Sequence, residues 1–494
     1  MVDFSKDRRN GFAAPQRFEA DVFDCEVIGT VPGDLNGALA RVGGNLFYPQ
    51  RFENDSSANS DGYISTFRFD NGTVHYRGRY VRTPRMMANV EAKRELFGLY
   101  RNPFTDEPAV AGVDRTVANT APLVHHGKLF ALKEDGLPYE VDPLTLETIG
   151  RYDFNGAYKS ETFTAHPKID PETGEMICYG TEATGLLSDD MFIYVVGADG
   201  GVRKEIRIKV PYISMVHDIA VTRNYILIPI YGYISNMEML KAGKVHWGWD
   251  DEIPGYVGVL ARDGDGSDIR WFKGPPGHAT VHTVNAWEEG DTIHLDAPIF
   301  VGAPFPDFPP VDGTPWDISR AKAYFTRQSF DMASTDSGWR EQVLFDMPVA
   351  DLARMDNRFR MRPYRYAFTQ FFDATRKLDE RVGAGGSAKG TIRNSYGRFD
   401  MQTGEVQSLY AGDSHSLQEC QFVPRRPDSP EGDGYLLGVA NNLAEMRSEL
   451  IIADAANLAG GELARVILPF RASSQVHCEW LSVDEFPGLA AGRF

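Results

Sequence analysis

The chain has 494 residues, of which 42% are hydrophobic and 12% aromatic, and its formal net charge is -18. This charge argues against nucleic-acid binding, which usually needs a basic stripe on the protein surface, and against attraction to an anionic membrane surface. No run of about 18 apolar residues is present, and the charged N-terminal stretch lacks the apolar centre of a secretory signal. We therefore expect a cytoplasmic protein without stable membrane association.

The four cysteines are far apart in the sequence and form no CxxC pair. Neither a thiolate zinc site nor a disulfide framework is therefore indicated. We expect reduced thiols at all four positions, which are Cys25, Cys178, Cys420 and Cys478.

Short runs rich in β-branched and aromatic residues, bounded by turns, dominate the chain and are typical of β-strands. In chain order they are KLFAL, MICYG, MFIYVV, YILIPI, YVGVLA, TIHLDAP, AYFTRQSF and GYLLGVA. Helical periodicity is scarce and favours short helices only near residues 234–243 and 349–355.

Turn sequences connect these runs over the whole length of the chain. They include FDNGTVHY, DPETGEM, GADGGVRK, RDGDGSD and FDMQTGEV. Three of them share an Asp, a short spacer and a Gly at a position that needs positive φ. Since no break in composition divides the chain, the pattern favours one all-β propeller domain over residues 1–494. The alternative, two β-sandwiches joined by a linker, lacks a linker candidate.

The stretch HATVHTVNAWEEGDTIHLD, residues 278–296, contains three histidines that could form a local metal site. The preceding Gly and Pro residues and the alternating β-branched residues favour a loop that enters a strand. His278 and His282 would then be about 13 Å apart, too far to share a metal ion. His294 falls on the return strand, so the local cluster is not expected to form one site.

A second set of histidines is distributed along the chain in similar contexts, each after a small or apolar residue at an expected strand end. They are His166, His217, His282 and His477. Inner strands of a propeller could bring such positions to one axis, where neutral imidazoles would bind zinc, copper, iron or nickel. The alternative for each is a buried histidine bonded to the backbone. Five other histidines look like ordinary turn or surface residues: His75, His125, His126, His246 and His415.

A buried dication with neutral ligands needs acidic groups nearby, and each ligand needs its second ring nitrogen held by an acceptor. Carboxylates in apolar contexts are Glu134, Asp346 and Glu419. The alternative is that these are ordinary surface acids.

Over nearly its full length the chain resembles the carotenoid cleavage oxygenases, and within them the bacterial lignostilbene dioxygenases. The stretches that carry the resemblance are NTAPLVHHGKLFALKEDGLPYEVDPLTLETIGRYDF, TAHPKIDPETGEM, MVHDIAVT, VHTVNAWEEGD, RPYRYAF, HSLQECQFVPR and VHCEWL. The resemblance implies a seven-bladed β-propeller, with loops and a few short helices that cap non-haem Fe(II) on its axis. The implied iron ligands are the four distributed histidines, supported by Glu134, Asp346 and Glu419. Asp346 stands where the family usually has Glu.

The resemblance also implies a substrate clamp. In lignostilbene-type enzymes a tyrosine and a lysine hold the 4-hydroxyl group, and Tyr100 and Lys133 match them. Lys133 follows an apolar strand, where a lysine is costly unless paired. A phenolate would satisfy it; the alternative is an ion pair with a nearby carboxylate. Thr120 looks like the residue whose methyl crowds an open iron position, and Phe305 is either an aromatic cavity wall or a loop anchor.

The implied activity is O2-dependent cleavage of the central double bond of a phenolic stilbene into two aromatic aldehydes such as vanillin, and the subgroup resemblance implies a homodimer. Within the family, the alternative substrate is an apocarotenoid, or another phenylpropanoid alkene such as isoeugenol or resveratrol. Outside it, the alternative is a propeller that hydrolyses a lactone or only binds a ligand; a calcium-dependent hydrolase would favour carboxylate and carbonyl ligands.

Overall fold

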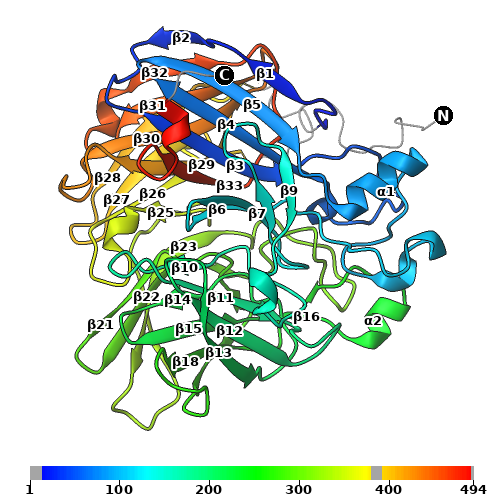
Figure 1. The fold of residues 1–494 in the computed structure, drawn as a ribbon. Coiled ribbons are helices and arrows are strands. Elements are labelled where there is room, and N and C mark those ends of the chain that lie inside the picture. Colours follow the sequence, from blue (N-terminus) through cyan, green and yellow to red (C-terminus); the bar gives the residue numbers. More distant parts are fainter. Residues whose placement is uncertain (1–13, 380–391, 491–494) are drawn as a thin grey trace.

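Seven antiparallel sheets stand around a common axis in the computed structural model, which describes residues 14–379 and 392–490 (Figure 1). The first blade has the order β1 (Ala20–Val22), β5 (Thr73–Tyr80), β4 (Gly62–Asp70), β3 (Gly37–Gly44), β33 (His477–Ser482). The last has the order β2 (Glu26–Gly29), β32 (Glu462–Ile467), β31 (Arg447–Asp454), β30 (Gly434–Asn442), β29 (His415–Pro424). The prediction of a seven-bladed propeller is confirmed.

The other five blades follow in chain order between these two. The second consists of β6 (Ala121–His125), β7 (Lys128–Leu132), β8 (Tyr139–Val141) and β9 (Thr148–Arg151). The third consists of β10 (Lys168–Ile169), β11 (Met176–Thr181), β12 (Asp190–Val196) and β13 (Val202–Lys209). The fourth consists of β14 (Ala220–Val221), β15 (Tyr225–Ile230), β18 (Pro254–Ala261), β19 (Arg270–Pro276). The fifth consists of β20 (His278–Ala279), β22 (Thr292–Val301), β23 (Ala323–Asp331), β24 (Arg340–Val343), with β21 (Asn285–Glu289) beside β22. The sixth consists of β25 (Arg354–Met355), β26 (Tyr366–Phe371), β27 (Ser395–Asp400), β28 (Val406–Tyr410).

Strands from the two ends of the chain close the ring. The C-terminal strand β33 pairs with β3, with His477 opposite Val42, and it also contacts the inner strands β6 and β29 of the neighbouring blades. The N-terminal strand β2 pairs with β32 at the outer edge of the last blade. In Figure 1 the blue N-terminal strands therefore lie beside the orange and red C-terminal strands. This closure leaves only short, protected sheet edges.

The hydrophobic core is divided among the interfaces between adjacent blades. One cluster joins the first and last blades through Leu39, Phe67 and Val439. Another joins the third and fourth blades through Ile193 and Ile228. Because the apolar faces of adjacent blades pack against one another, polar side chains can occupy the axis.

All eight strands predicted from the sequence are present, and the expected turns have the expected geometry. Asp400 accepts hydrogen bonds from the backbone N–H groups of Gln402 (3.0 Å) and Thr403 (3.1 Å), and Gly404 has φ +75°. Gly174 repeats this conformation with φ +71°. The four cysteines are buried free thiols, as expected.

The helix predicted near residues 234–243 is confirmed as α2 (Met237–Lys241). The prediction of a helix near residues 349–355 is wrong. The backbone N–H of Val349 bonds to the carbonyl of Ala323 (2.9 Å), and that of Ala350 bonds to Gln370 (2.9 Å). Pairing across two blades thus holds the segment extended, although its apolar spacing suits a helix.

A second helix, α1 (Pro84–Ala92), was not anticipated from the sequence, although Thr83 caps its N-terminus and Pro84 occupies its first turn. Remaining elements are a small sheet and short 3-10 turns: β16 (Tyr233–Ile234), β17 (Gly248–Trp249), η3 (Ser57–Asn59), η4 (Pro103–Thr105), η5 (Pro108–Val110), η6 (Phe154–Gly156), η7 (Asn357–Phe359), η8 (Leu458–Gly460), η9 (Pro487–Ala490). Both α-helices lie on one side of the molecule (Figure 1). Neither of the described helices has the length and apolar character needed to span a bilayer.

Candidate metal centre and adjoining cavity

Four histidines meet on the propeller axis because each stands where the chain enters an inner strand. His166 precedes β10, His217 precedes β14, His282 lies between β20 and β21, and His477 begins β33. Their ligand atoms all lie within 4.8 Å of one another. The Nε2 atoms are 3.0 Å apart for His166 and His217, and also for His217 and His282.

The local cluster around residue 282 does not form, as the sequence indicates. His278 lies 3.7 Å from Glu341, and Nδ1 of His294 lies 2.9 Å from Oγ of Ser329. Only His282 of that stretch reaches the axis.

Carboxylates hold the outer ring nitrogen of three of these histidines. Nδ1 of His217 contacts Glu134, Nδ1 of His477 lies 3.0 Å from Glu419, and Nδ1 of His282 lies 3.0 Å from Asp351. An Nδ1–H that donates to a carboxylate leaves the Nε2 lone pair free. The free lone pairs then face one another across the axis.

This arrangement fits a bound divalent transition metal. Burial and the neighbouring imidazoles hold the pKa of His166 well below its usual value, and burial lowers the pKa of His477 to about 4 although Glu419 opposes the shift. Neutral imidazoles whose lone pairs converge suit iron, zinc, copper or nickel. Three carboxylates around four neutral ligands supply the charge that a buried dication needs.

The prediction that Asp346 supports a histidine is wrong; Asp351 takes that place. Asp346 is exposed beyond the end of β24, whereas the Asp351 side chain is only 14% exposed and bonds to His282. The inter-blade pairing at Val349 and Ala350 directs the following residue toward the axis. Local sequence context could not show this, because the pairing partners lie in two other blades.

Glu134 and Glu419 lie where the sequence predicts. Glu419 belongs to β29, and the register of β29 against β30 shifts between Leu417 and Cys420. Such a bulge re-aims a side chain, here toward the axis. Glu419 is fully buried and also pairs with Arg354 at 2.9 Å.

A cavity of about 410 Å³ adjoins the histidines, a size within the range of small-molecule sites. Its lining includes His217, His282 and His477, together with loops that cap this end of the axis. Four residues singled out from the sequence line it: Tyr100, Thr120, Lys133 and Phe305. Sequence reasoning missed Phe308, whose ring centroid lies 5.9 Å from that of Tyr100, and Arg471.

Lys133 is a buried cation in the wall of this cavity. Its Nζ donates to Oγ1 of Thr120 (3.2 Å), lies 3.4 Å from Glu134 and lies 5.2 Å from the centre of the Tyr100 ring. Burial favours the neutral amine and is the largest single effect, but Glu134, Tyr100 and Asp135 together outweigh it, so the pKa of Lys133 is raised. The alternative considered for Lys133, an ion pair with a carboxylate, is therefore present.

Tyr100 remains a neutral phenol at neutral pH, because burial raises its pKa to about 12 although Lys133 opposes the shift. Its hydroxyl and the Lys133 ammonium are thus both donors. A ligand oxygen placed between them would receive two hydrogen bonds, one of them from a charged group.

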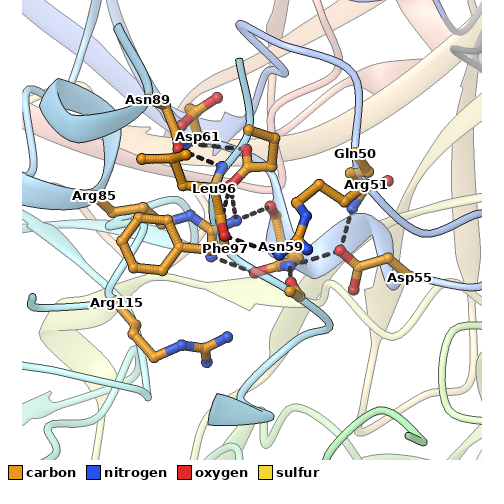
Figure 2. A network of polar contacts seen from close by, with 12 residues as sticks. Gln50, Arg51, Asp55, Asn59, Asp61, Arg85, Asn89, Leu96, Phe97 and Arg115 are labelled. Carbon is orange, nitrogen blue, oxygen red and sulfur yellow. Dashed lines mark hydrogen bonds and ion pairs between the residues drawn. The ribbon is translucent and has the colours of Figure 1, made fainter. Parts of the chain in front are cut away.

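A buried polar network that includes Asp55, Asn59 and Arg85 (Figure 2) reaches the backbone of Tyr100 through Asp55. Oδ1 of Asp55 accepts its N–H at 2.8 Å, and Oδ2 of Asp55 accepts from Asn59 at 2.6 Å. Arg85 of α1 donates to Oδ1 of Asn59 (2.6 Å) and pairs with Glu95 (3.2 Å). The helix α1 is therefore tied to the cavity wall through side chains.

A second network holds the other side of Tyr100. The N–H of His246 donates to the Tyr100 carbonyl (3.1 Å), and Nε2 of His246 lies 3.1 Å from Glu182, which also pairs with Arg101 (2.5 Å). His246 is fully buried, so its expected surface position is wrong. Its neighbours in sequence are charged and indole residues, and only the fold shows that Glu182 from another blade meets it.

Comparisons with known proteins agree with this geometry. The family model described as retinal pigment epithelial membrane protein matches residues 13–482. The chain is 44% identical to an isoeugenol monooxygenase of Pseudomonas putida (96% of this chain and 97% of the relative covered) and 39% identical to lignostilbene-alpha,beta-dioxygenase isozyme III of Sphingomonas paucimobilis (97% of each). It matches the crystal structure of a Pseudomonas brassicacearum lignostilbene dioxygenase with TM-score 0.91 and 38% identity, over 94% of this chain and 96% of that one.

Proposed function

Since the chain belongs to the carotenoid cleavage oxygenase family, we propose that it is an Fe(II)-dependent dioxygenase that cleaves the central double bond of a phenolic stilbene. The products would be two aromatic aldehydes, such as vanillin from a lignostilbene. One observation carries the proposal: the donors of Tyr100 and Lys133 share a cavity with three of the four axial histidines.

Fe(II) held by His166, His217, His282 and His477 would supply the O2 chemistry. Tyr100 and Lys133 would bind the 4-hydroxyl group and fix the position of the conjugated system. Because a neighbouring cation lowers the pKa of a phenol, Lys133 favours the phenolate, whose electron density extends to the alkene carbons. Thr120 accepts a hydrogen bond from Lys133 and would place its methyl beside the metal.

Glu134 connects the two halves of the site. It contacts Nδ1 of His217 and lies 3.4 Å from Lys133, so one carboxylate orients both a metal-binding histidine and a substrate-binding lysine. Phe305 and Phe308 line the cavity, and we propose that they form an aromatic wall for the substrate.

A second candidate substrate is a propenylphenol, because two relatives at 44% and 41% identity are isoeugenol monooxygenases. Such a compound offers the same phenol to Tyr100 and Lys133 but has only one ring. We also propose a cytoplasmic location; the homodimer stays a prediction that sedimentation of the purified protein can test.

The test is an aerobic assay of the Fe(II)-loaded protein with 4-hydroxystilbene, 4-methoxystilbene, isoeugenol and an apocarotenal, with aldehydes measured by chromatography. We expect cleavage of the free phenols and not of the methoxy analogue. Equal cleavage of the methoxy analogue would contradict the clamp. Cleavage of the apocarotenal alone would contradict the substrate class, and a metal other than iron after anaerobic purification would contradict the cofactor.

A further inference from the structure

Arg471 is a buried cation in the cavity wall without a counter-charge among the described residues. It is 9% exposed and lies in the loop between β32 and β33, six residues before His477. Its terminal nitrogens donate to the carbonyls of Ala472 (3.2 Å) and Ala14, and its Nε has no hydrogen-bond partner in residues 14–379 and 392–490. Within the described part of the chain, no carboxylate pairs with it.

Two other buried arginines are paired with acids: Arg85 lies 3.2 Å from Glu95, and Arg101 lies 2.5 Å from Glu182. Arg41 is also buried and has no acid partner within the described residues, but it donates to the side chain of Gln418 and does not line the cavity. By contrast, burial alone lowers the pKa of Arg471, without a contribution from a charged group in the described part of the chain. A guanidinium removed from water and left without an anion raises the free energy of the folded state. Such a group in a cavity wall is therefore a natural binding point for an anion.

A second unsatisfied polar group lies two residues further along the chain. The hydroxyl of Ser473 is buried and has no hydrogen-bond partner among the described residues, and Ser473 lines the same cavity as Arg471. Two neighbouring groups with unused donors, one of them cationic, match an oxygen acceptor such as a carboxylate. Natural proteins rarely leave buried polar groups unsatisfied, so both groups require an explanation.

Arg471 does not belong to the phenol clamp. The hydrogen bonds of Arg471 go to the carbonyls of Ala472 and Ala14, and its pKa is lowered by burial with no contribution from Lys133. The two cations also lie in different connections of the propeller: Lys133 follows β7 of the second blade, and Arg471 lies in the loop that joins the last blade to the first. A ligand that places its phenol at Lys133 would therefore meet Arg471 with a different part of its structure.

We propose that Arg471 and Ser473 bind an ionised oxygen substituent, a carboxylate or a phenolate, on the half of the substrate that does not contact Tyr100 and Lys133. This inference rests on the proposed function and narrows its substrate class. It favours a two-ring stilbene that is acidic on its second ring over isoeugenol, which has no oxygen to offer beyond its phenolic ring.

Binding of uncleavable analogues tests the inference without catalysis. The ligands are 4-hydroxybibenzyl, its 4'-carboxylate and the methyl ester of that carboxylate, titrated by calorimetry into the full-length protein. We expect the carboxylate to bind at least about tenfold more tightly than the ester, the effect of one charged hydrogen bond. In Arg471→Met the two ligands should bind alike, and in Arg471→Lys part of the preference should remain.

Two further variants protect the test against misfolding. Arg471→Gln keeps an amide donor for the carbonyls of Ala14 and Ala472 but removes the charge, and Ser473→Ala removes a single hydroxyl. Each should unfold near the native melting temperature, with the carboxylate preference abolished in the first and reduced in the second. An unchanged preference in a folded Arg471→Gln protein, or no preference in the native protein, would overturn the inference.

The Lys133→Met variant separates this inference from the proposed function. If both hold, this variant weakens all three ligands by a similar factor and keeps the carboxylate preference. If the preference depends on Arg471 but Lys133→Met changes nothing, the clamp fails and the Arg471 site stands. If binding depends on Lys133 alone, the clamp stands and the Arg471 site fails, and absence of binding by every ligand counts against both.

Discussion

At the scale of single residues, the substrate-binding lysine and a metal-binding histidine of the site share one acidic partner. Lys133 is held by Glu134 and Thr120, and Glu134 in turn holds His217. Substrate binding and metal orientation therefore meet in one carboxylate, and a change at Lys133 can be separated from a change at the metal only if both are measured.

Replacing Lys133 by Met should lower kcat/KM for 4-hydroxystilbene by about 10- to 100-fold, since it removes a charged hydrogen bond to the phenolate. Iron content, measured by plasma emission, should stay at the native level because the four histidines are untouched. Lys133→Arg keeps the charge and serves as the control. Native turnover by a folded Lys133→Met enzyme would refute the role of this lysine.

Replacing Asp351 by Asn should lower metal affinity by about 10- to 100-fold, because the amide no longer accepts the Nδ1–H of His282 with a full charge. Asp346→Asn is the matched control, since that side chain is exposed. Competition with a chromophoric chelator measures the metal affinity of both variants. Equal affinities of the two variants would show that Asp351 does not support the metal.

At the scale of elements, α1 does more than cover a blade: its Arg85 anchors the network that ends at the N–H of Tyr100. Just after α1, Arg94 forms an exposed ion pair with Glu107. The two pairs differ in burial, since the Arg85 side chain is 2% exposed and that of Arg94 is 52% exposed.

Arg85→Met should lower the free energy of unfolding by about 3 kcal/mol, because it leaves the buried Glu95 without its counter-charge. Arg94→Met, which removes the exposed pair, should change it by less than about 1 kcal/mol. Denaturant unfolding followed by tryptophan fluorescence compares the two. Similar losses in both variants would mean that burial does not determine the strength of these pairs.

At the scale of the whole molecule, stability depends on contacts between blades, and some of these contacts are ionic. Glu182 follows β11 and meets Arg101 and His246, which lie in loops outside its blade. Burial opposes its ionisation, but Arg101 and His246 outweigh burial and lower the pKa of Glu182 to about 2, from an ordinary value of 4.5. Since the folded-state pKa is the lower one, its stabilisation is complete above about pH 4.5 and is lost as the pH falls toward 2.

The melting temperature should therefore fall between about pH 5 and pH 2, with a contribution from Glu182 on the order of 3 kcal/mol. Glu182→Gln should lower the melting temperature at pH 6 and flatten this dependence. Scanning calorimetry across the pH range measures both effects. A Glu182→Gln protein with the native pH dependence would exclude this pair as a source of acid sensitivity.

The sequence, with the family resemblance that it carries, determined eight of the strands, the turns between them and the four axial histidines. Strand runs such as residues 225–230 are recognisable because apolar content and flanking turns are local properties. His166, His217, His282 and His477 could be selected because each stands at the start of a strand, and the family resemblance assigned them a common axis.

Only the tertiary structure decided which side chains meet between blades. Val349 is extended, not helical, and Asp351 replaces Asp346, because residues 323 and 370 of other blades fix the backbone between them. His246 is buried, since Glu182 reaches it from a distant part of the chain. Arg471 was not singled out because an arginine without a counter-charge cannot be distinguished in a sequence from an ordinary surface arginine; its isolation depends on every neighbour that the closed ring places around it.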